Sequence, residues 1–388
     1  MAKQDRTRHP KVGGVPAGVE DIMQAIREAV DEATADLGRF NLLAIGNTGA
    51  GKSSLINAVF GWKIAETGIG RPVTDGTKSY EHPHHPITFF DTRGIEIGEG
   101  KAVIVERLVG EIKSRQMRPI EDQIHVAWYC LRWSDRRLED GQADVIRAVA
   151  ATGVPVILVM TQVPQQDGRC HPDAIELAES IVAMGLPLSP GSGVILTAAI
   201  NDPWTGGAHG LPELLDATLA VVPEGARNAL VASQQIDLQR KRDASGDIVL
   251  QHAAMSATAA ASPIPFSDAA ALVPIQLAMI ARVTAIWGLD VSKRTLANVI
   301  GSALLTSGAT YVGRQIVAGL LKLIPGIGWL AGAALNAGVA SGLTLSIGTA
   351  WTTVVEALAS KPENVSTLSS EEVNAAFKQA FRPGQEAA

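Results

Sequence analysis

The sequence predicts two domains of different class: an α/β domain with a mostly parallel sheet flanked by helices, followed by an all-α, Ala/Gly-rich helical domain. In residues 40–222, short apolar runs alternate with helical patterns, as expected for a parallel sheet. Strand patterns stop after Pro223, and residues 323–355 contain no charged side chain. The length of 388 residues leaves room for about two or three domains.

Composition restricts the function classes. The 33 basic and 39 acidic residues give a net charge of -6, which argues against a broad surface for nucleic acid. Two cysteines cannot form a disulfide framework, and no signal-peptide pattern opens the sequence, so the cytoplasm is the expected compartment. Nucleic acid is therefore not an expected partner.

The first 39 residues predict a tail and one helix. Residues 1–13 are polar and basic without apolar periodicity, which predicts a disordered tail. Apolar residues then recur at helical spacing from Ile22 to Leu37, and Gly38 lies where a helix would stop. Residues 14–39 are therefore expected to form an N-terminal amphipathic helix.

The strongest motif is GNTGAGKS, which matches G-x-x-x-x-G-K-[ST] between a predicted strand and a predicted helix. Glycines let consecutive backbone N–H groups point at phosphate oxygens, and the helix N-terminus adds its positive dipole. Lys52 would neutralise the phosphates, and the Ser53 hydroxyl suits Mg²⁺. A plain glycine-rich turn is the weaker alternative. The predicted phosphate-binding residues are Gly46, Asn47, Thr48, Gly49, Ala50, Gly51, Lys52, Ser53 and Ser54. The α/β domain is thus expected to be a P-loop NTPase.

A second element, ITFFDTRG, would complete the metal site. An apolar strand ends in Asp91, at the sheet edge where ligands of such folds bind, and Gly94 follows three residues later. Asp91 could hold a water bound to Mg²⁺, and the Gly94 amide could contact the γ-phosphate. The pattern D-x-x-G is weak alone and gains weight from its own predicted strand after the phosphate loop.

Residues 62–80 lie between these motifs and are rich in glycine and threonine, which predicts a mobile loop over the γ-phosphate. Thr74 is the preferred threonine for a hydroxyl ligand of Mg²⁺, with Thr77 as runner-up. Two solvent-facing turn threonines are the alternative. The expected magnesium ligands are thus Ser53, Thr74 and Asp91.

The run GNTGAGKSSLINAVFG followed by DTRG resembles the Era-like branch of the translation-factor class of GTPases, also labelled the 50S ribosome-binding GTPase domain. The resemblance covers residues 40–221 and implies GTP or GDP with Mg²⁺ as ligands. Its guanine-reading loop, N/T-K-x-D, corresponds here to Thr161, Gln162, Val163 and Pro164. Proline replaces the aspartate, and Asp167 is a possible substitute, so guanine against adenine specificity stays open.

Other features of this resemblance concern the base and the reaction. The loop that packs against the base would be Thr197-Ala198-Ala199. Lys52, Thr74 and Gly94 would serve catalysis, but Ile95 follows D-x-x-G where Ras-type enzymes place a glutamine, so slow hydrolysis is expected. Dynamin-like relatives complete such sites by dimerising. A nucleotide-dependent homodimer therefore stays open. Two loop arginines could stabilise the developing charge, within one chain or across such a dimer, and the alternative is that both are solvated loop residues. These arginines are Arg71 and Arg93.

Three further patterns are given a structural interpretation. The histidines of EHPHHP are expected in a turn between antiparallel strands, with a metal cluster as the weaker alternative. Cys170 is adjacent to His171, but no upstream Cys or His lies at ligand spacing, so a catalytic cysteine is not indicated. The basic run of residues 240–242 is expected to be a solvated helix face.

The C-terminal part is predicted to comprise a connecting helix, residues 223–247, and an all-α domain, residues 248–388, with a charge-poor helical hairpin at 295–357. Small residues at every fourth position of its second helix predict a close packing face. They are Ala334, Gly338, Gly342, Ser346 and Ala350. This region resembles a helical domain of unknown function that follows Era-like modules in bacteria. A buried core and reversible membrane association are both open, and permanent spanning ranks below them.

The function predicted from the sequence is a GTP-binding protein and slow GTPase, a nucleotide-dependent switch whose helical domain engages a membrane or a protein partner. The first alternative is a protein that interacts with or remodels membranes under nucleotide control. The second is a ribosome or RNA assembly GTPase, by family analogy alone. The expected localisation is cytoplasmic, with peripheral, reversible membrane association left open.

Overall fold

The computed structural model describes residues 28–61 except 30, 71–92 except 75–76 and 83–84, 101–260 except 204–205, 268–289 and 337–360. The chain divides into two compact units. The α/β unit comprises Thr34–Ala244 and Ala285–Gly288, and the helical unit comprises the remainder, chiefly Ser245–Thr284 and the described residues after 336. The exact domain limits expected from the sequence stay predictions.

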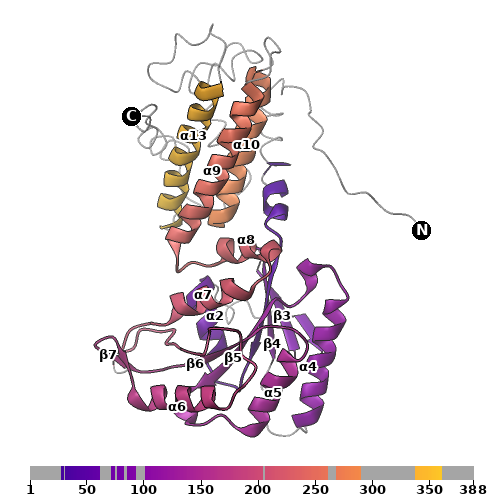
Figure 1. Cartoon of the computed structure of the whole chain (residues 1–388), viewed down its shortest axis with the longest axis vertical. Helices are drawn as coiled ribbons and strands as arrows, with labels where there is room; N and C mark the ends of the chain where they lie inside the picture. The colour runs from indigo at the N-terminus through magenta and orange to yellow at the C-terminus, as the bar shows by residue number, and fades with distance from the viewer. Residues whose placement is uncertain are drawn as a thin grey trace, which may run out of the picture. The chain divides into compact units, whose positions relative to one another are not determined.

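The α/β unit is built on a seven-stranded sheet of order β2-β3-β4-β1-β5-β6-β9 (Figure 1). The five strands from β4 to β9 are parallel, whereas β3 pairs antiparallel with β4 and with β2. The strands are β1 Phe40–Ile45, β2 Arg71–Thr74, β3 Thr77–Glu81, β4 Ile87–Thr92, β5 Val126–Arg132, β6 Val156–Thr161 and β9 Val194–Leu196. The predicted fold class is confirmed.

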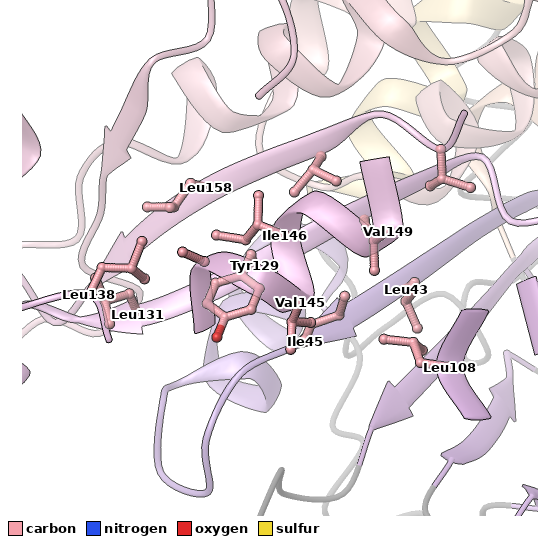
Figure 2. Packing of buried hydrophobic residues seen from close by; sticks show 14 of the residues in the cluster. Leu43, Ile45, Leu108, Tyr129, Leu131, Leu138, Val145, Ile146, Val149 and Leu158 are labelled. Carbon is pink, nitrogen blue, oxygen red and sulfur yellow. The ribbon is translucent and has the colours of Figure 1, made fainter. Parts of the chain in front are cut away.

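The central strands are mostly apolar because helices cover both faces of the sheet. All residues of β1 and β6 are buried. Leu43, Ile45, Tyr129 and Leu131 face one layer of helices and pack with Ile146 (Figure 2). Trp128 points to the opposite face, where its indole N–H donates to Thr218 in a second helical layer.

The helices begin and end at residues with an identifiable physical role. α2 ends at Gly61, which adopts the left-handed conformation with φ 64°. Glu139 and Gln142 form a reciprocal capping box at the start of α5, and Pro172 opens α6. The helices of the α/β unit are α2 Lys52–Phe60, α4 Lys101–Gln116, α5 Asp140–Ala150, α6 Pro172–Ala183, α7 Leu211–Val221 and α8 Glu224–Ser233.

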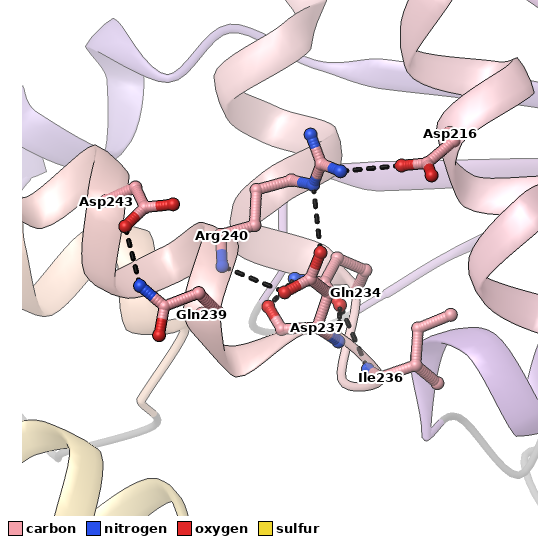
Figure 3. A network of polar contacts seen from close by, with 7 residues as sticks. All are labelled: Asp216, Gln234, Ile236, Asp237, Gln239, Arg240 and Asp243. Atoms are coloured by element: carbon pink, nitrogen blue, oxygen red, sulfur yellow. Dashed lines mark hydrogen bonds and ion pairs between the residues drawn. The ribbon is translucent and has the colours of Figure 1, made fainter.

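The segment predicted as one connecting helix is broken. α8 ends at Ser233, and α9, Leu238–Ala260, begins after a turn that side chains stabilise. The Gln234 amide oxygen accepts the backbone N–H groups of Ile236 and Asp237, and the Asp237 carboxylate accepts that of Arg240 (Figure 3). These local bonds replace helical ones, which explains the break.

The basic run at the start of α9 is not a uniform solvated face. Arg240 pairs with Asp216 and Asp237 at 2.6 and 3.1 Å, whereas Lys241 is buried and donates to the Ala232 and Trp287 carbonyls. Burial lowers the pKa of Lys241 to about 7. The expectation of solvent exposure was therefore wrong for Lys241, because its environment comes from distant parts of the chain.

In the helical unit, α9, α10 (Asp268–Trp287) and α13 (Ala337–Ala359) run side by side (Figure 1). Buried polar side chains are paired: Thr344 Oγ1 donates to Ser256 Oγ at 2.8 Å, and Trp351 Nε1 donates to Thr284 Oγ1 at 3.0 Å. The first helix of the predicted hairpin lies outside the described residues. None of the described helices is long and apolar enough to cross a membrane.

The packing face of α13 differs from the predicted stripe of small residues. Gly338 and Gly342 are exposed and, among the described residues, an added Cβ at Gly342 would meet nothing within 4 Å. Thr344 and Trp351 are buried, and a Cβ at Gly348 would lie 2.5 Å from a Val249 methyl group. The stripe prediction was wrong for Gly338 and Gly342 because small size alone does not specify which face of a helix is buried.

This difference predicts opposite effects for two similar substitutions. Gly348→Ala should lower the free energy of unfolding by about 1–3 kcal/mol, because the methyl group overpacks Val249. Gly342→Ala, the matched control, should raise it by up to about 1 kcal/mol, because alanine favours a helix. Urea unfolding of both variants checks this, and two changes of the same sign would contradict the packing face described here.

Candidate functional site

The glycine-rich loop between β1 and α2 has the backbone of an anion-binding loop. Gly46, Gly49 and Gly51 have φ values of 145°, 77° and 82°, which few side chains tolerate. α2 starts at Lys52 with no side-chain cap and no acidic residue in its first turn. Its first N–H groups are therefore not matched to a capping side chain, and the helix dipole favours an anion there.

The ends of β5 and β6 hold this loop in place. A Cβ at Gly46 would collide with the Cys130 carbonyl oxygen, so the strand and the loop touch through their backbones. The Thr161 hydroxyl donates to the Ala50 carbonyl at 2.8 Å, and the Gln162 amide donates to the Gly49 carbonyl at 3.0 Å. The loop conformation thus depends on two neighbouring strands.

Lys52 is only 8% exposed and lies inside the loop. Its ammonium donates to the Gly46 and Asn47 carbonyls at 2.9 and 3.4 Å and lies 3.7 Å from Asp91 Oδ1. Asp91 is near the end of β4, opposite Ala44 of β1 in the sheet register. The structure thereby brings together two residues that the sequence indicated separately.

The Asp91 carboxylate fits the metal role that the sequence suggested. Its Oδ1 is buried and, within the described residues, accepts no hydrogen bond. A buried acceptor without a hydrogen bond is costly unless a ligand completes it. The Ser53 hydroxyl belongs to an exposed residue in the first turn of α2 and offers another hard oxygen. These donors suit Mg²⁺ beside a phosphate group, and the assignment stays a prediction.

The two charges also act on Cys130, near the end of β5. Burial raises the pKa of its thiol to about 12, while the positive charge of Lys52 opposes the rise and the negative charge of Asp91 adds to it. The thiol therefore stays protonated at neutral pH. Cys130 is a buried residue that packs behind the loop.

The region expected as a mobile loop contains two strands. β2 and β3 form an antiparallel hairpin at the sheet edge in which Thr74 is opposite Thr77. The prediction of a loop over all of residues 62–80 was thus wrong for residues 71–74 and 77–80. These residues form strands because β3 pairs with β4 and extends the sheet. The side chains of Thr74 and Thr77 are outside the described set. Residues 93–95, with the predicted Arg93, Gly94 and Ile95, also lie outside it.

The residues expected near the base have structural roles in the domain. Thr197 is fully buried and its hydroxyl donates to the Met160 carbonyl at 3.1 Å. The Ala198 N–H donates to His209. Asp167 is exposed in the turn between two short strands, β7 (Gln165–Gln166) and β8 (Arg169–Cys170), with φ 51°. The base contacts suggested for Thr161, Gln162, Thr197 and Ala198 stay predictions.

The histidine-rich segment connects β3 to β4, as expected for a turn. The His85 N–H donates to His82 Nδ1 at 3.0 Å, and the two rings lie 4.3 Å apart. Among the described residues, no group of three or more His, Cys, Asp or Glu side chains could hold a metal ion.

One charged residue beside the loop was missed from the sequence. Arg132 ends β5, and its Nη2 pairs with Asp135 Oδ1 at 2.9 Å. A Cβ at Gly49 would lie 3.6 Å from its Nη1. The sequence does show a charged residue at the end of a buried strand, but no motif marks this residue as functional. Its proximity to the loop arises only from the tertiary structure.

Two family models match the chain, in agreement with this geometry. Residues 41–162 match the model described as 50S ribosome-binding GTPase, and residues 226–382 match a domain of unknown function (DUF697). The chain joins a GTPase domain to DUF697. Within the GTPase domain, the matched region contains the phosphate loop, Lys52 and Asp91. The match to a GTPase model supports a guanine nucleotide as the ligand of this domain.

Individual relatives are distant. Magnetosome membrane protein 22 of Magnetospirillum gryphiswaldense is 29% identical over 145 residues, 37% of this chain and 72% of that protein. A probable GTP-binding protein engB is 16% identical with a TM-score of 0.31, over 47% of this chain and 97% of that one. Aquifex aeolicus Era bound to GDP.AlF4- is 18% identical with a TM-score of 0.32, over 56% of this chain and 67% of that one.

The close contact at Gly46 predicts a large effect of one methyl group. Gly46→Ala should lower the free energy of unfolding by about 3 kcal/mol or more, because backbone strain adds to the collision with Cys130. Gly153→Ala is the matched control: φ there is 86° but, among the described residues, no atom lies within 4 Å of an added Cβ. Its cost should be about 1–2 kcal/mol. Equal costs in urea unfolding would show that the loop is not packed on β5.

Proposed function

We propose that this protein is a magnesium-dependent, slow GTPase that acts as a nucleotide-controlled switch. The observation that carries the proposal is the buried Lys52 ammonium inside the glycine loop, 3.7 Å from an Asp91 oxygen that accepts no hydrogen bond among the described residues. A buried cation at a helix N-terminus, beside a carboxylate at the same sheet edge, matches the needs of a phosphate chain with its metal.

In this proposal, the chain's own groups bind and orient the triphosphate. The loop N–H groups and Lys52 hold the β- and γ-phosphates, and Ser53, Thr74 and Asp91 hold Mg²⁺, directly or through a water. When bound, Mg²⁺ would neutralise the charge that develops on the phosphates. The Gly94 amide would contact the γ-phosphate. Ile95 offers no group to orient water, so intrinsic hydrolysis is slow.

Guanine is the base that the GTPase family favours, and its discrimination is expected to be modest here. Pro164 stands where the family places a carboxylate that accepts from guanine. A site that reads a base strongly leaves a buried polar group unpaired when the wrong base binds. Without that carboxylate, the difference in affinity between GTP and ATP should be smaller than in relatives that carry it.

The helical domain is the proposed output of the switch. Residues 323–355 carry no charge, and one relative is named a magnetosome membrane protein, which together favour a membrane surface over a protein effector. Release of the γ-phosphate would move the loops around Thr74 and Gly94, and this motion would alter how the helical domain engages its target. A net charge of -6 disfavours the alternative of an RNA assembly factor.

The nucleotide proposal is tested by Lys52→Ala. Removing the buried ammonium should weaken binding of a fluorescent GTP analogue by about a hundredfold or more, because a charge-assisted phosphate contact and the loop geometry are both lost. Lys113→Ala, on the exposed face of α4, is the matched control and should bind normally. Fluorescence titration measures both, and wild-type affinity in the Lys52 variant would remove the core of the proposal.

The output proposal is tested by liposome flotation of the full chain. We expect more protein to float with a non-hydrolysable GTP analogue than with GDP, because only the triphosphate would order the loops that control the helical domain. The Lys52→Ala variant should show no nucleotide dependence. Protein that stays at the bottom in every tube would contradict the membrane output and favour a protein effector.

A further inference from the structure

We propose that Arg132 is an additional phosphate-binding residue of this site, on the side of the phosphate loop opposite the predicted metal. This inference rests on the proposed nucleotide binding and adds a residue to it. The inference is based on two observations: the Arg132 guanidinium lies at the carboxyl end of a central strand, and its nitrogen atoms differ in the contacts that they make.

The sheet order places Arg132 and Asp91 on opposite sides of the loop. The loop follows β1, and β1 lies between β4 and β5. Asp91 ends the β4 side, whereas Arg132 ends β5, opposite Thr161 of β6 in the register. Any phosphate chain held by the loop would thus have the carboxylate, with its metal, on one flank and the guanidinium on the other.

Not every nitrogen atom of the Arg132 guanidinium has a partner within the described residues. Nη2 is held by Asp135 at 2.9 Å, which limits the rotation of the side chain. Nη1 lies next to Gly49, 3.6 Å from the position of an added Cβ. Nε is buried and, in the part of the chain that the structure describes, has no hydrogen-bond partner. A buried N–H without an acceptor is costly, and a phosphate oxygen is the acceptor that this loop is shaped to bring.

The side chain also remains open to a ligand. It is 37% exposed, so a phosphate can reach it, yet Asp135 keeps it oriented before binding. A guanidinium fits phosphate with paired N–H groups, which an ammonium cannot reproduce. Lys52 and Arg132 would then bind the phosphate chain from two directions, and Asp135 would serve as a positioning residue.

The location of Arg132 predicts which nucleotides should bind more weakly when this residue is replaced. Since it lies away from the predicted metal side, Arg132→Met should weaken GDP and a GTP analogue alike, by about ten- to a hundredfold, with Mg²⁺ or with EDTA. Arg132→Lys should recover part of this affinity. Asp135→Asn should weaken nucleotide binding less than Arg132→Met does. Adding Asp135→Asn to Arg132→Met should cause no further loss of affinity, because Asp135 acts only through the Arg132 guanidinium.

The experiment is a titration of fluorescent GDP and a GTP analogue, with thermal unfolding of each variant measured with and without nucleotide. Arg147→Met is the matched control, because Arg147 makes a similar 3.0 Å pair with Asp144 on the exposed face of α5. The expected result is a reduced nucleotide-dependent rise in Tm for Arg132→Met, with the nucleotide-free Tm near wild type.

Three results would overturn the inference. The first is wild-type affinity in Arg132→Met, and the second is a loss confined to the Mg²⁺-bound GTP analogue, which would place the residue on the metal side. The third is a lower nucleotide-free Tm with unchanged affinity, which would assign Arg132 a structural role. If wild-type protein binds neither nucleotide, the proposed function itself is wrong, whereas normal wild-type binding with an unaffected variant rejects Arg132 alone.

Discussion

The buried ammonium of Lys52 is the constraint around which the α/β unit is organised. A cation removed from water is unstable unless other groups replace its hydration. Here the Gly46 and Asn47 carbonyls and the nearby Asp91 carboxylate do so, which requires the loop to fold over the amine. That loop in turn needs glycine where it touches the β5 backbone, and needs the ends of β4, β5 and β6 in register. The sheet is thus the means by which one loop keeps its shape.

The predictable part of this structure was encoded locally. Runs such as FNLLAI and VILVMT are mostly apolar because both sheet faces are covered, and the conformation of the glycine loop requires glycine at its positive-φ positions. The remainder depends on distant residues. Lys241 is buried by carbonyls of other helices, the edge hairpin of β2 and β3 exists because β4 offers a free edge, and Arg132 gains its position from the sheet order. No local pattern contains those facts.

For the proposed nucleotide site, the hydroxyl groups lead us to expect firmer binding of the phosphates than of the base. Thr161 and Thr197 direct their hydroxyls to carbonyls of the domain and stabilise the ends of β6 and β9. Hydroxyl groups used in this way maintain the shape of the loops that are predicted to contact the base, and their protons are not available to a ligand. The predicted phosphate loop, in contrast, has a buried cation, a carboxylate oxygen that accepts no hydrogen bond within the described residues, and a helix N-terminus without a side-chain cap. Binding energy should therefore come mainly from the phosphates.

The polar pairs inside the helical unit limit how it could respond to nucleotide. Thr344 with Ser256, and Trp351 with Thr284, are satisfied only while α9, α10 and α13 keep their present register. Separating these helices on an apolar surface would leave each donor without its acceptor, at about 1–3 kcal/mol for each buried group. Coupling between two sites in one protein is typically about 1–3 kcal/mol as well. A nucleotide could therefore promote separation of these helices only if binding to the target surface supplied much of the energy. Separation would then require both the target and the nucleotide.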